Sequence, residues 1–428
     1  MDYEDTKVLW VWLTQIFPYS SMKIAALIDV YTDIEDIYNE EKYYEVRFND
    51  SEIRALKNKN LDDAYKIIEK TKAVNAEILT YDDDMYPENL RHIPDRPYVL
   101  YVKGKIIEWD KYLLISIIGK RDCSEYGIAA TRKIAGELAQ MGVVIVSGLA
   151  RGLDAAASIE ALRYNRYSIG ILGCAIDNVY PKENKILYDA IEKTGTIISE
   201  YPPGSNPGKQ GFVLRNRLIA GFSNGLLVVE AAEKSGTKIT VNYAYEYGRD
   251  VFAVPGSIFN KNCEGTNRML MGSAKAVIGG KDIMVEYPYA VEKLKAPMGN
   301  IYLREIPEIG ILIGGNINSE ERLNVRPYAK NYTASNLTEH RRNAVSEKKI
   351  KEQPSQRHNE EEQRPKINAE KFSGTEKLII DILLKGEKQK DEIIREIAAD
   401  AGEVNTALIM LEMQGAVKQI PGNIYKLK

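Results

Sequence analysis

Residues 215–231 read RNRLIAGFSNGLLVVEA, in which two arginines and an asparagine precede an apolar run that ends at Glu230. The GLLVVEA half has the length and composition of a β-strand that is buried on both faces. Five similar runs occur between residues 113 and 256: LLISIIG, VVIVSGL, YSIGILG, TIISEY and DVFAVPG. Segments with helical spacing of apolar residues separate these runs. The pattern predicts an α/β domain with a doubly wound, mostly parallel, Rossmann-like sheet.

Three other segments flank this sheet domain, which we place at residues 81–285. Residues 1–80 carry apolar residues at helical spacing and predict an N-terminal helical domain. Residues 286–372 include SEKKIKEQPSQRHNEEEQRPKINAEK, which mixes both charges and lacks aromatic residues, so a disordered linker is predicted there. Residues 373–428 contain three amphipathic helical segments, then AVKQI and IYKLK around a Pro-Gly-Asn turn. Three helices and a hairpin are typical of a winged-helix domain.

The composition argues against several classes of protein. The net charge of -3 creates no global basic field, so a site for a polyanion must be a local patch. No apolar stretch approaches the roughly 20 residues that span a membrane. The first residues, MDYEDTKVLW, lack the basic head of a signal peptide. We therefore expect a cytoplasmic protein without membrane contact.

Cysteine and histidine usage points away from disulfide, metal and hydrolytic chemistry. Three well-separated cysteines cannot form a disulfide framework, which indicates a reducing compartment: Cys123, Cys174 and Cys263. Of the three histidines, His340 and His358 fall in the predicted linker, and no Cys or His cluster has metal-ligand spacing. We interpret His92 as a structural loop residue. The sequence predicts no metal, no cofactor and no catalytic residue.

Glycines, hydroxyl residues and cations follow the strands of the predicted sheet, at the edge where doubly wound folds bind their ligands. Glycines let backbone amides approach a ligand, and cations attract anions. Each glycine alone is explained by a tight turn, but the recurrence of these residue types at one rim predicts a phosphate-binding cleft. The candidate residues are Gly119, Lys120, Arg121, Gly148, Arg151, Lys182, Lys209, Arg215, Asn216, Ser235 and Gly236.

A polynucleotide suits this cleft better than a single nucleotide. The stretch IIGKRDCSEYG does not match G-x-G-x-x-G, and no Walker sequence occurs. Cations on several loops suit a polymer backbone. Four aromatic residues flank these loops, and they either stack on bases of a single strand or pack in the core: Tyr126, Tyr180, Tyr201 and Phe212.

The two arginines of the RNR triplet are predicted to have different roles. On a helix they lie about 200° apart, so they cannot share one face. We expect Arg215 to turn outward to a phosphate. Arg217 is then expected to turn inward to a buried carboxylate, either Glu200 or Glu230, because an unpaired buried charge is costly.

The chain resembles the bacterial DNA-processing protein A family (DprA, also called Smf). The similarity covers residues of about 85 to 280, where family landmarks occur in family order. These are YPENLRHIPDRPYVLYVKG, IIGKR, VIVSGLARGLDAAAS, ILGCAIDNVYPKEN, GTIISEYPPG, FVLRNRLIAGFSNGLLVVEA, SGTKIT, GRDVFAVPGS and EGTNRMLMGSA. The C-terminal segment also resembles the winged helix that many members carry.

The resemblance implies a protein that binds single-stranded DNA and loads the RecA recombinase onto it, usually in natural transformation. It also implies a homodimer that forms through the Rossmann-like domain. Carried over by motif, the DNA pocket would use Arg121, Lys182, Arg215 and Asn216. In this transfer Gly119 and Gly148 would give backbone contacts.

This sequence departs from the family pattern at four positions, where Lys120, Ser158, Ala175 and Lys238 replace a serine, a histidine, a glycine and a leucine. PYSS occupies the place of the glycine-bearing hairpin of a helix-hairpin-helix module. The third winged-helix segment, EVNTALIMLEMQ, lacks the basic residues of a groove-reading helix. We therefore expect the N-terminal helices to pack or to bind a partner. We expect the winged helix to bind a protein partner or to add an accessory DNA contact, rather than to read duplex DNA.

Two other functions stay open beside a non-enzymatic single-strand binder. A Rossmann-like nucleotide phosphoribohydrolase would cleave a glycosidic bond on the same fold, although EKSGTK matches its glycine-rich loop poorly. A transcription regulator would read duplex DNA through the winged helix.

Overall fold

The computed structural model describes residues 3–18, 21–41, 48–233 and 235–293, and a smaller C-terminal part. That part comprises residues 372, 374–397, 404, 407, 408, 411, 416–420 and 424–427. The chain divides into two compact units, Met1–Lys349 and Ile350–Lys428, and each is described by itself. Most of the predicted linker, residues 294–371, lies outside the described residues, so its disorder stays a prediction. The first part of that segment forms the short 3-10 helix η3 (Pro288–Lys293).

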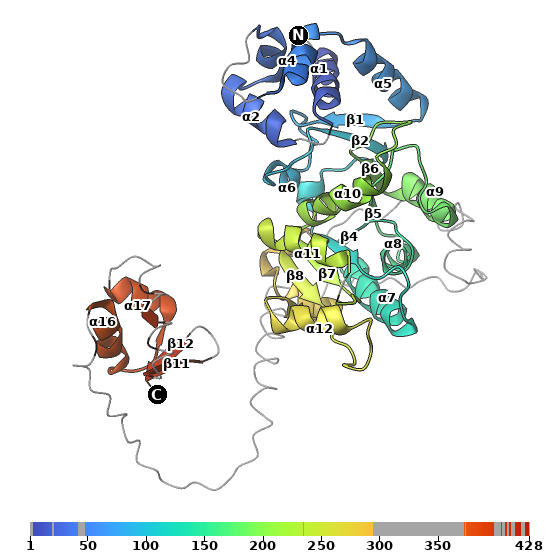
Figure 1. The fold of residues 1–428 in the computed structure, drawn as a ribbon. Helices are drawn as coiled ribbons and strands as arrows, with labels where there is room; N and C mark the ends of the chain where they lie inside the picture. The colour runs from blue at the N-terminus through green and yellow to red at the C-terminus, as the bar shows by residue number, and fades with distance from the viewer. Residues whose placement is uncertain are drawn as a thin grey trace. The chain divides into compact units, whose positions relative to one another are not determined.

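A nine-stranded sheet forms the centre of the first unit (Figure 1). Its spatial order is β1-β2-β6-β5-β4-β3-β7-β8-β9. The strands are β1 (Glu77–Thr80), β2 (Val99–Gly104), β3 (Leu114–Ile118), β4 (Val144–Ser147), β5 (Ser168–Leu172), β6 (Thr196–Ser199), β7 (Gly225–Val228), β8 (Asp250–Ala253) and β9 (Lys275–Ala276). Strands β3 to β9 pair in parallel, whereas β1 and β2 add to β6 in antiparallel fashion. The prediction of a mostly parallel doubly wound sheet is confirmed.

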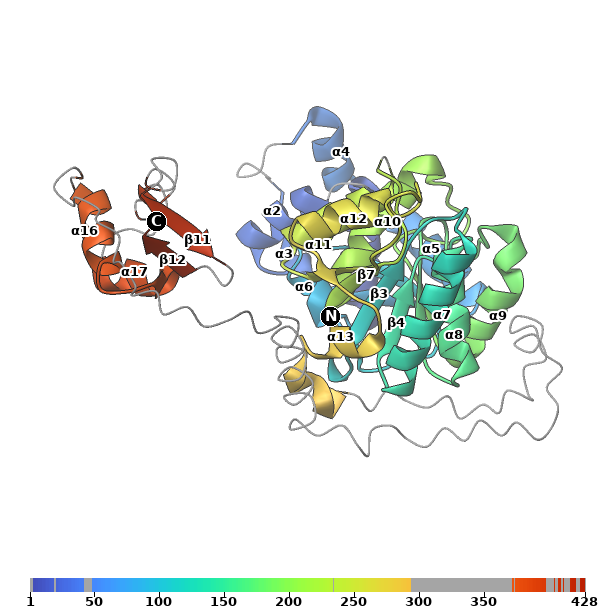
Figure 2. The same cartoon turned by 90° about the horizontal axis from the view of Figure 1, so that it is seen from below.

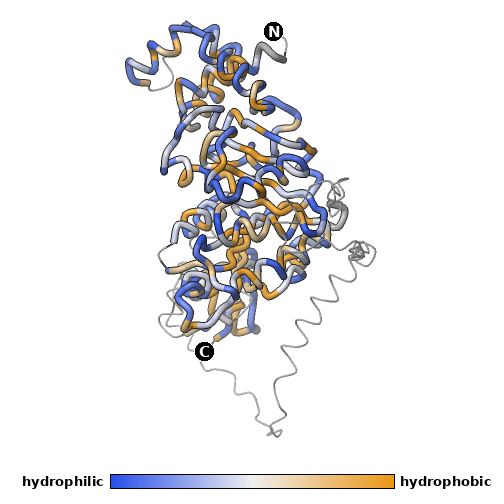
Figure 3. The backbone as a smooth tube through the Cα atoms, turned by 90° about the vertical axis from the view of Figure 1, so that its right-hand side faces the viewer, coloured by the Kyte–Doolittle hydropathy of each residue, from blue (hydrophilic) through white to orange (hydrophobic). Residues whose placement is uncertain are grey.

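Helices cover both faces of the sheet, which explains why the strands are apolar on both sides. On β3, Leu114 and Ile118 join the core cluster of α10 (Gly208–Phe222) and α11 (Thr237–Glu246). Ile115 and Ile117 alternate with them and join the cluster of α7 (Glu125–Gln140), α8 (Leu153–Arg163) and α13 (Gly280–Met284). Figure 2 shows α7 and α8 on one side of β3 and β4 and α10 and α11 on the other. Figure 3 shows the hydrophobic stretches gathered in the middle of the layers.

The N-terminal helices share a core with one end of the sheet. They are α1 (Tyr3–Ile16), α2 (Ser21–Tyr31), α3 (Ile34–Asn39), α4 (Asp50–Asn58) and α5 (Asp62–Ala73). The ring of Trp10 is fully buried and stacks on Tyr98 with ring centroids 5.4 Å apart. Its Nε1 donates to Asp82 Oδ2 at 2.5 Å. The helices therefore belong to the same compact unit as the sheet, and β1 starts the sheet at Glu77, four residues before the predicted boundary at residue 81.

The second unit has the elements of a winged helix. It contains α16 (Gly374–Leu383), β10 (Lys388–Gln389), α17 (Lys390–Ile397), β11 (Val417–Ile420) and β12 (Ile424–Leu427). The strands form an antiparallel sheet in the order β10-β12-β11. Helical residues Val404, Leu408 and Leu411 are buried with Ile379 and Tyr425 in one cluster. This arrangement confirms the predicted winged-helix domain.

None of the helices within the described ranges combines the length and the apolar character that crossing a lipid bilayer requires.

The contact between α1 and the sheet gives a test of the shared core. Replacement Trp10→Ala removes a buried ring and a hydrogen bond, so we expect the free energy of unfolding to fall by ~3–5 kcal/mol. Denaturant unfolding, followed by circular dichroism and tryptophan fluorescence, measures this loss. Met22 on α2 is 70% exposed, and Met22→Ala serves as the control with little change. Separate unfolding of the helices and the sheet would contradict a shared core.

Candidate nucleic-acid interface

The loops after β3 and β7 enclose a pocket at the point where the strand order reverses. From β3 the chain proceeds to β4, β5 and β6 on one side, and then returns to β7 and β8 on the other. Ligands of doubly wound folds bind beyond the carboxyl ends of the strands at this switch point. The pocket measures about 350 Å³, and we call it the switch-point pocket. The predicted residues that line it are Gly119, Lys120, Arg121, Arg215, Asn216, Ser235 and Gly236.

A small cavity of about 20 Å³ adjoins the switch-point pocket and shares the walls Arg121, Phe212 and Arg215 with it. This adjoining cavity adds two further predicted residues, Gly148 and Arg151. The structure thus brings together residues from the loops after β3, β4 and β7 and from α10. Their convergence is what the positions at the strand ends predict.

Two predicted lysines lie beyond these cavities. Lys182 is exposed in the 3-10 helix η2 (Lys182–Asn184), directly after Pro181, which lines the adjoining cavity. Lys209 is exposed in the first turn of α10, about one turn before Phe212. Both lysines therefore extend the cationic surface away from the switch point without lining the cavities themselves.

Aromatic side chains accompany the cations. The rings of Tyr180 and Phe212 lie 4.7 Å apart at an angle of 50°, and Tyr180 is 47% exposed. Tyr201, by contrast, is buried, which favours the core-packing interpretation for that residue. Tyr126 is 47% exposed and its hydroxyl donates to the Pro255 carbonyl at 2.6 Å.

Arg215 does not turn outward, so that prediction is wrong. Its side chain is only 5% exposed and forms the floor of the switch-point pocket. Its Nη1 donates to the Gly148 carbonyl at 2.8 Å and to the Ile171 carbonyl. The guanidinium thereby ties α10 to the ends of β4 and β5. Burial lowers the pKa of Arg215, and the nearby Asp154 opposes this shift.

Asp154 is a functional candidate that is missing from the predicted residues. It is 6% exposed in the first turn of α8, and it lines the switch-point pocket. Its carboxylate accepts from the amides of Gly119 at 3.3 Å and Gly148 at 3.1 Å. Burial raises the pKa of Asp154, although Arg215 and the two amides lower it. The sequence signal for it is the acidic residue that follows the glycine turn in SGLARGLD.

The two glycine amides both donate to Asp154 in this structure. A Cβ atom at Gly148 would come within 2.6 Å of Arg215 Nη1 and 2.7 Å of Asp154 Oδ2. At Gly119 it would meet the Leu153 side chain at 2.5 Å. Close packing is sufficient to explain both glycines, and contact of their backbones with DNA stays a prediction.

Arg217 turns inward as predicted, and its partner is Glu200. Its Nη2 donates to Glu200 Oε1 at 2.6 Å, and its Nε lies 3.4 Å from Asp95 Oδ2. Burial lowers the pKa of Arg217, but the two carboxylates outweigh this effect and raise it. Glu230 instead accepts from the backbone amide of Ser124 at 3.0 Å and from its hydroxyl, at the start of α7.

Exposed cations near the pockets differ in how far acidic residues neutralise them. Arg151 Nε lies 3.5 Å from Glu183 Oε1, and both side chains are more than half exposed. Half-buried Lys120 donates from Nζ to Asn262 Oδ1, a neutral acceptor, at 2.6 Å. Arg121 is exposed where the two cavities meet. The charge available at this edge is therefore mainly positive, with Asp122 as an acidic neighbour.

The pockets lack the features of a metal centre. Among the described residues, no group of three or more His, Cys, Asp and Glu side chains could hold a metal ion.

The loop before α11 supplies the last two predicted residues. The Ser235 hydroxyl accepts from the Thr237 amide at 3.2 Å at the start of α11, and Gly236 borders open space.

The ion pair between buried Arg217 and part-buried Glu200 gives a prediction for stability. In Arg217→Met the carboxylate of Glu200 loses its charged partner, so we expect the free energy of unfolding to fall by ~3–5 kcal/mol. Chemical denaturation measures the change. The control is Lys185→Met, which breaks an exposed pair with Asp189 and should change stability little. Equal effects of the two replacements would contradict a structural role for the Arg217–Glu200 pair.

Known families match both units of the chain. The family described as DNA recombination-mediator protein A matches residues 77–288, which contain the sheet and its pockets. The DprA winged helix domain matches residues 374–423.

Relatives and a solved structure extend this likeness. The DNA processing protein DprA of Streptococcus pneumoniae is 40% identical over 229 residues, which are 54% of this chain and 79% of that protein. The protein Smf of Synechocystis is 32% identical over 365 residues, covering 85% of this chain and 83% of the relative. The X-ray structure of DNA processing protein A from Streptococcus pneumoniae superposes with a TM-score of 0.58 at 32% identity, over 65% of this chain and 97% of that one. The chain belongs to the DNA recombination-mediator protein A family.

Proposed function

We propose that this protein binds single-stranded DNA along the switch-point pocket and the adjoining cavity. The observation that carries the proposal is the shared wall of the two cavities, where exposed Arg121 meets Phe212 and the buried Arg215. A cationic groove flanked by aromatic rings suits a single strand, because phosphates need charge and every base offers a face for stacking.

Buried and exposed cations have different roles at this site, and the difference supports the proposal. Arg215 and Asp154 fix the loops after β3 and β4, through Gly119 and Gly148. The side chains of Arg121, Lys182 and Lys209 are exposed, and we propose that they bind the phosphates of the strand. We further propose that Asn216, Ser235 and Gly236 give neutral polar contacts inside the pocket. Such contacts position a backbone without reading its sequence.

The role in recombination follows from membership of the family. We propose that the DNA-bound protein loads a RecA-type recombinase onto the strand in natural transformation or recombination. We also propose that it acts in the cytoplasm, as a homodimer that forms through the Rossmann-like domain. On this proposal the winged helix contacts a partner or adds a secondary DNA contact.

The single-strand site is tested by charge removal. In Arg121→Ala and Lys182→Ala, we expect binding to weaken alike for all base sequences. The slope of log affinity against log salt should become shallower by ~0.7 for each phosphate that the variant no longer neutralises. Fluorescence anisotropy with labelled oligonucleotides over a range of salt concentrations measures both effects. Lys66→Ala on α5 is the control, because that lysine is 65% exposed and lies among the N-terminal helices.

Unchanged affinity in both groove variants at moderate salt would contradict the placement of the site. Incubation of the wild-type protein with nucleoside monophosphates separates binding from hydrolysis, because release of free base would support the phosphoribohydrolase alternative.

Recombinase loading has its own readout. On single strands already coated with a single-strand-binding protein, the wild-type chain should shorten the lag before the DNA-dependent ATPase activity of RecA begins. Arg121→Ala should restore the lag, since loading requires the strand to be bound. An unshortened lag with the wild-type chain would count against RecA loading while leaving single-strand binding intact.

A further inference from the structure

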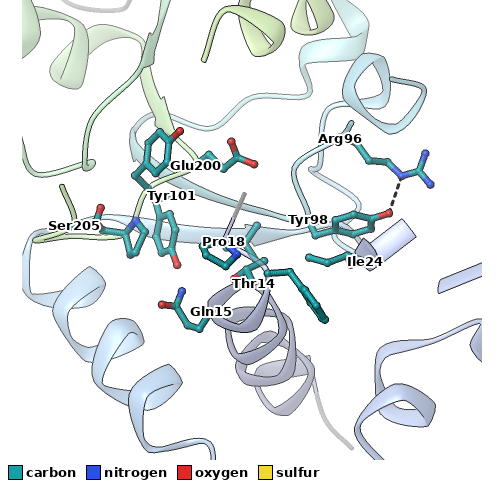
Figure 4. Close-up of a pocket in the computed structure, with 13 residues that line it drawn as sticks. Thr14, Gln15, Pro18, Ile24, Arg96, Tyr98, Tyr101, Glu200 and Ser205 are labelled. Atoms are coloured by element: carbon teal, nitrogen blue, oxygen red, sulfur yellow. Dashed lines mark hydrogen bonds between the residues drawn. The ribbon is translucent and has the colours of Figure 1, made fainter. Parts of the chain in front are cut away.

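A third cavity lies on the same edge of the sheet, between the N-terminal helices and the end of β6. It measures about 180 Å³, and we call it the α1–β6 pocket. Its walls come from the end of α1, the start of β2 and the loop that follows β6 (Figure 4). None of the eleven candidate residues of the phosphate-binding cleft lines it, although Tyr201, one of the four flanking aromatic residues, does. The predicted phosphate-binding residues therefore do not explain this pocket.

Tyr101 presents an unpaired polar group in this pocket. Its side chain is 1% exposed, and its hydroxyl hydrogen-bonds to no group among the described residues. Figure 4 shows its ring between the strand and the end of α1, with Gln15 beside it. A buried hydroxyl without a partner destabilises a fold, and such groups point to a strained or functional site.

Three other polar side chains of the lining have hydrogen-bond partners within the protein. Arg96 Nε donates to the Tyr98 hydroxyl at 3.3 Å. The Ser205 hydroxyl donates to the Pro202 carbonyl at 2.7 Å, and the Thr14 hydroxyl donates to the Val11 carbonyl at 2.9 Å. The hydroxyl of Tyr101 lacks such a partner in the described part of the chain and is therefore a buried donor that a ligand in the pocket can engage.

The shape and chemistry of the walls suit one flat ring. Most of the apolar lining is made of ring side chains: Phe17, Pro18, Tyr98, Tyr201 and Pro202. The volume lies below the ~300 Å³ at which pockets for drug-sized molecules begin. Glu200 also lines the pocket, with Oε1 bonded to Arg217 and the side chain 20% exposed. Its carboxylate retains acceptor capacity for a donor on the ligand.

The α1–β6 pocket is connected to the proposed DNA site by one short segment. Glu200, Pro202 and Ser205 line this pocket, and the chain then continues through exposed Lys209 to Phe212, which lines the switch-point pocket. A strand that follows this segment would pass a cation between the two sites. Both pockets also lie at the edge where the parallel strands end.

We propose that the α1–β6 pocket holds one nucleobase that carries an exocyclic amino group, on the strand bound at the switch point. This inference rests on the proposed single-strand function. The base ring packs among the aromatic side chains, its amino group donates to Glu200, and a carbonyl or ring nitrogen accepts from the Tyr101 hydroxyl. Single-strand proteins recognise unstacked bases by this combination of stacking and edge contacts.

The test compares oligo-dC with oligo-dT of about 16 nucleotides, within the range of single-strand site sizes. Cytosine carries the amino group and thymine lacks it, while both are pyrimidines of similar stacking area. We expect the wild-type chain to bind oligo-dC about tenfold more tightly, because a hydrogen bond to a charged group has that effect. Anisotropy titrations at one salt concentration measure both affinities.

Tyr101→Phe isolates the hydroxyl and keeps the ring. We expect this variant to lose most of the preference for oligo-dC, to bind oligo-dT as the wild type does, and to unfold at a temperature no lower than that of the wild type. Stability is retained because the hydroxyl has no partner in the unbound protein. Tyr65→Phe is the matched control, since Tyr65 is 50% exposed on α5 and should change neither property.

Several outcomes would overturn the inference. Equal affinity of the wild type for the two oligonucleotides would remove the base site but leave the proposed single-strand function standing. An undiminished preference in Tyr101→Phe would assign the discrimination to another place. A clear loss of stability in Tyr101→Phe would make the hydroxyl a structural group. Absence of binding to either oligonucleotide would instead overturn the proposed function as well.

Discussion

The buried guanidinium of Arg215 is the interaction on which the arrangement of the site depends. It joins α10 to the carbonyls of Gly148 and Ile171 at the ends of two parallel strands, and it lies beside the buried Asp154. Asp154 in turn holds the amides that follow β3 and β4. Burying charged groups costs free energy, so the contribution of Arg215 and Asp154 here is geometric: the loops after β3 and β4 and the end of β5 are fixed relative to one helix.

The buried contacts of Arg215 and Asp154 fix the shape of the groove, whereas other, exposed residues are the ones proposed to contact the DNA. Arg217, Glu200 and Asp95 fix the other face of α10 in the same way. The exposed cations are then free to adjust to a flexible polymer, because the backbone beneath them is held in place. Contact with the phosphates at the switch point requires this combination, since phosphates repeat along the strand while bases vary.

Much of the fold and part of the site could be predicted from the sequence. Six apolar runs separated by helices specify a parallel sheet, and the positions after those runs share one edge in any such fold. The role of Arg215 could not be predicted, because a helix fixes only that two arginines diverge by about 200° and not which of them meets carbonyls. The sequence marks Asp154 only as an acidic residue after a glycine turn. Its role could not be predicted, because its partners are backbone amides from two distant loops and spacing along the chain does not reveal such contacts.

The antiparallel addition of β1 and β2 has a consequence for preparing the sheet domain alone. A chain that started at residue 81 would lack β1, and the hydrogen-bonding edge of β2 would face solvent. It would also uncover the rings of Tyr98 and Tyr101, which the N-terminal helices bury. An unprotected apolar edge strand recruits other chains and promotes aggregation. The N-terminal segment thus covers an aggregation-prone edge of the sheet. The solubility of the sheet domain is therefore expected to depend on that segment.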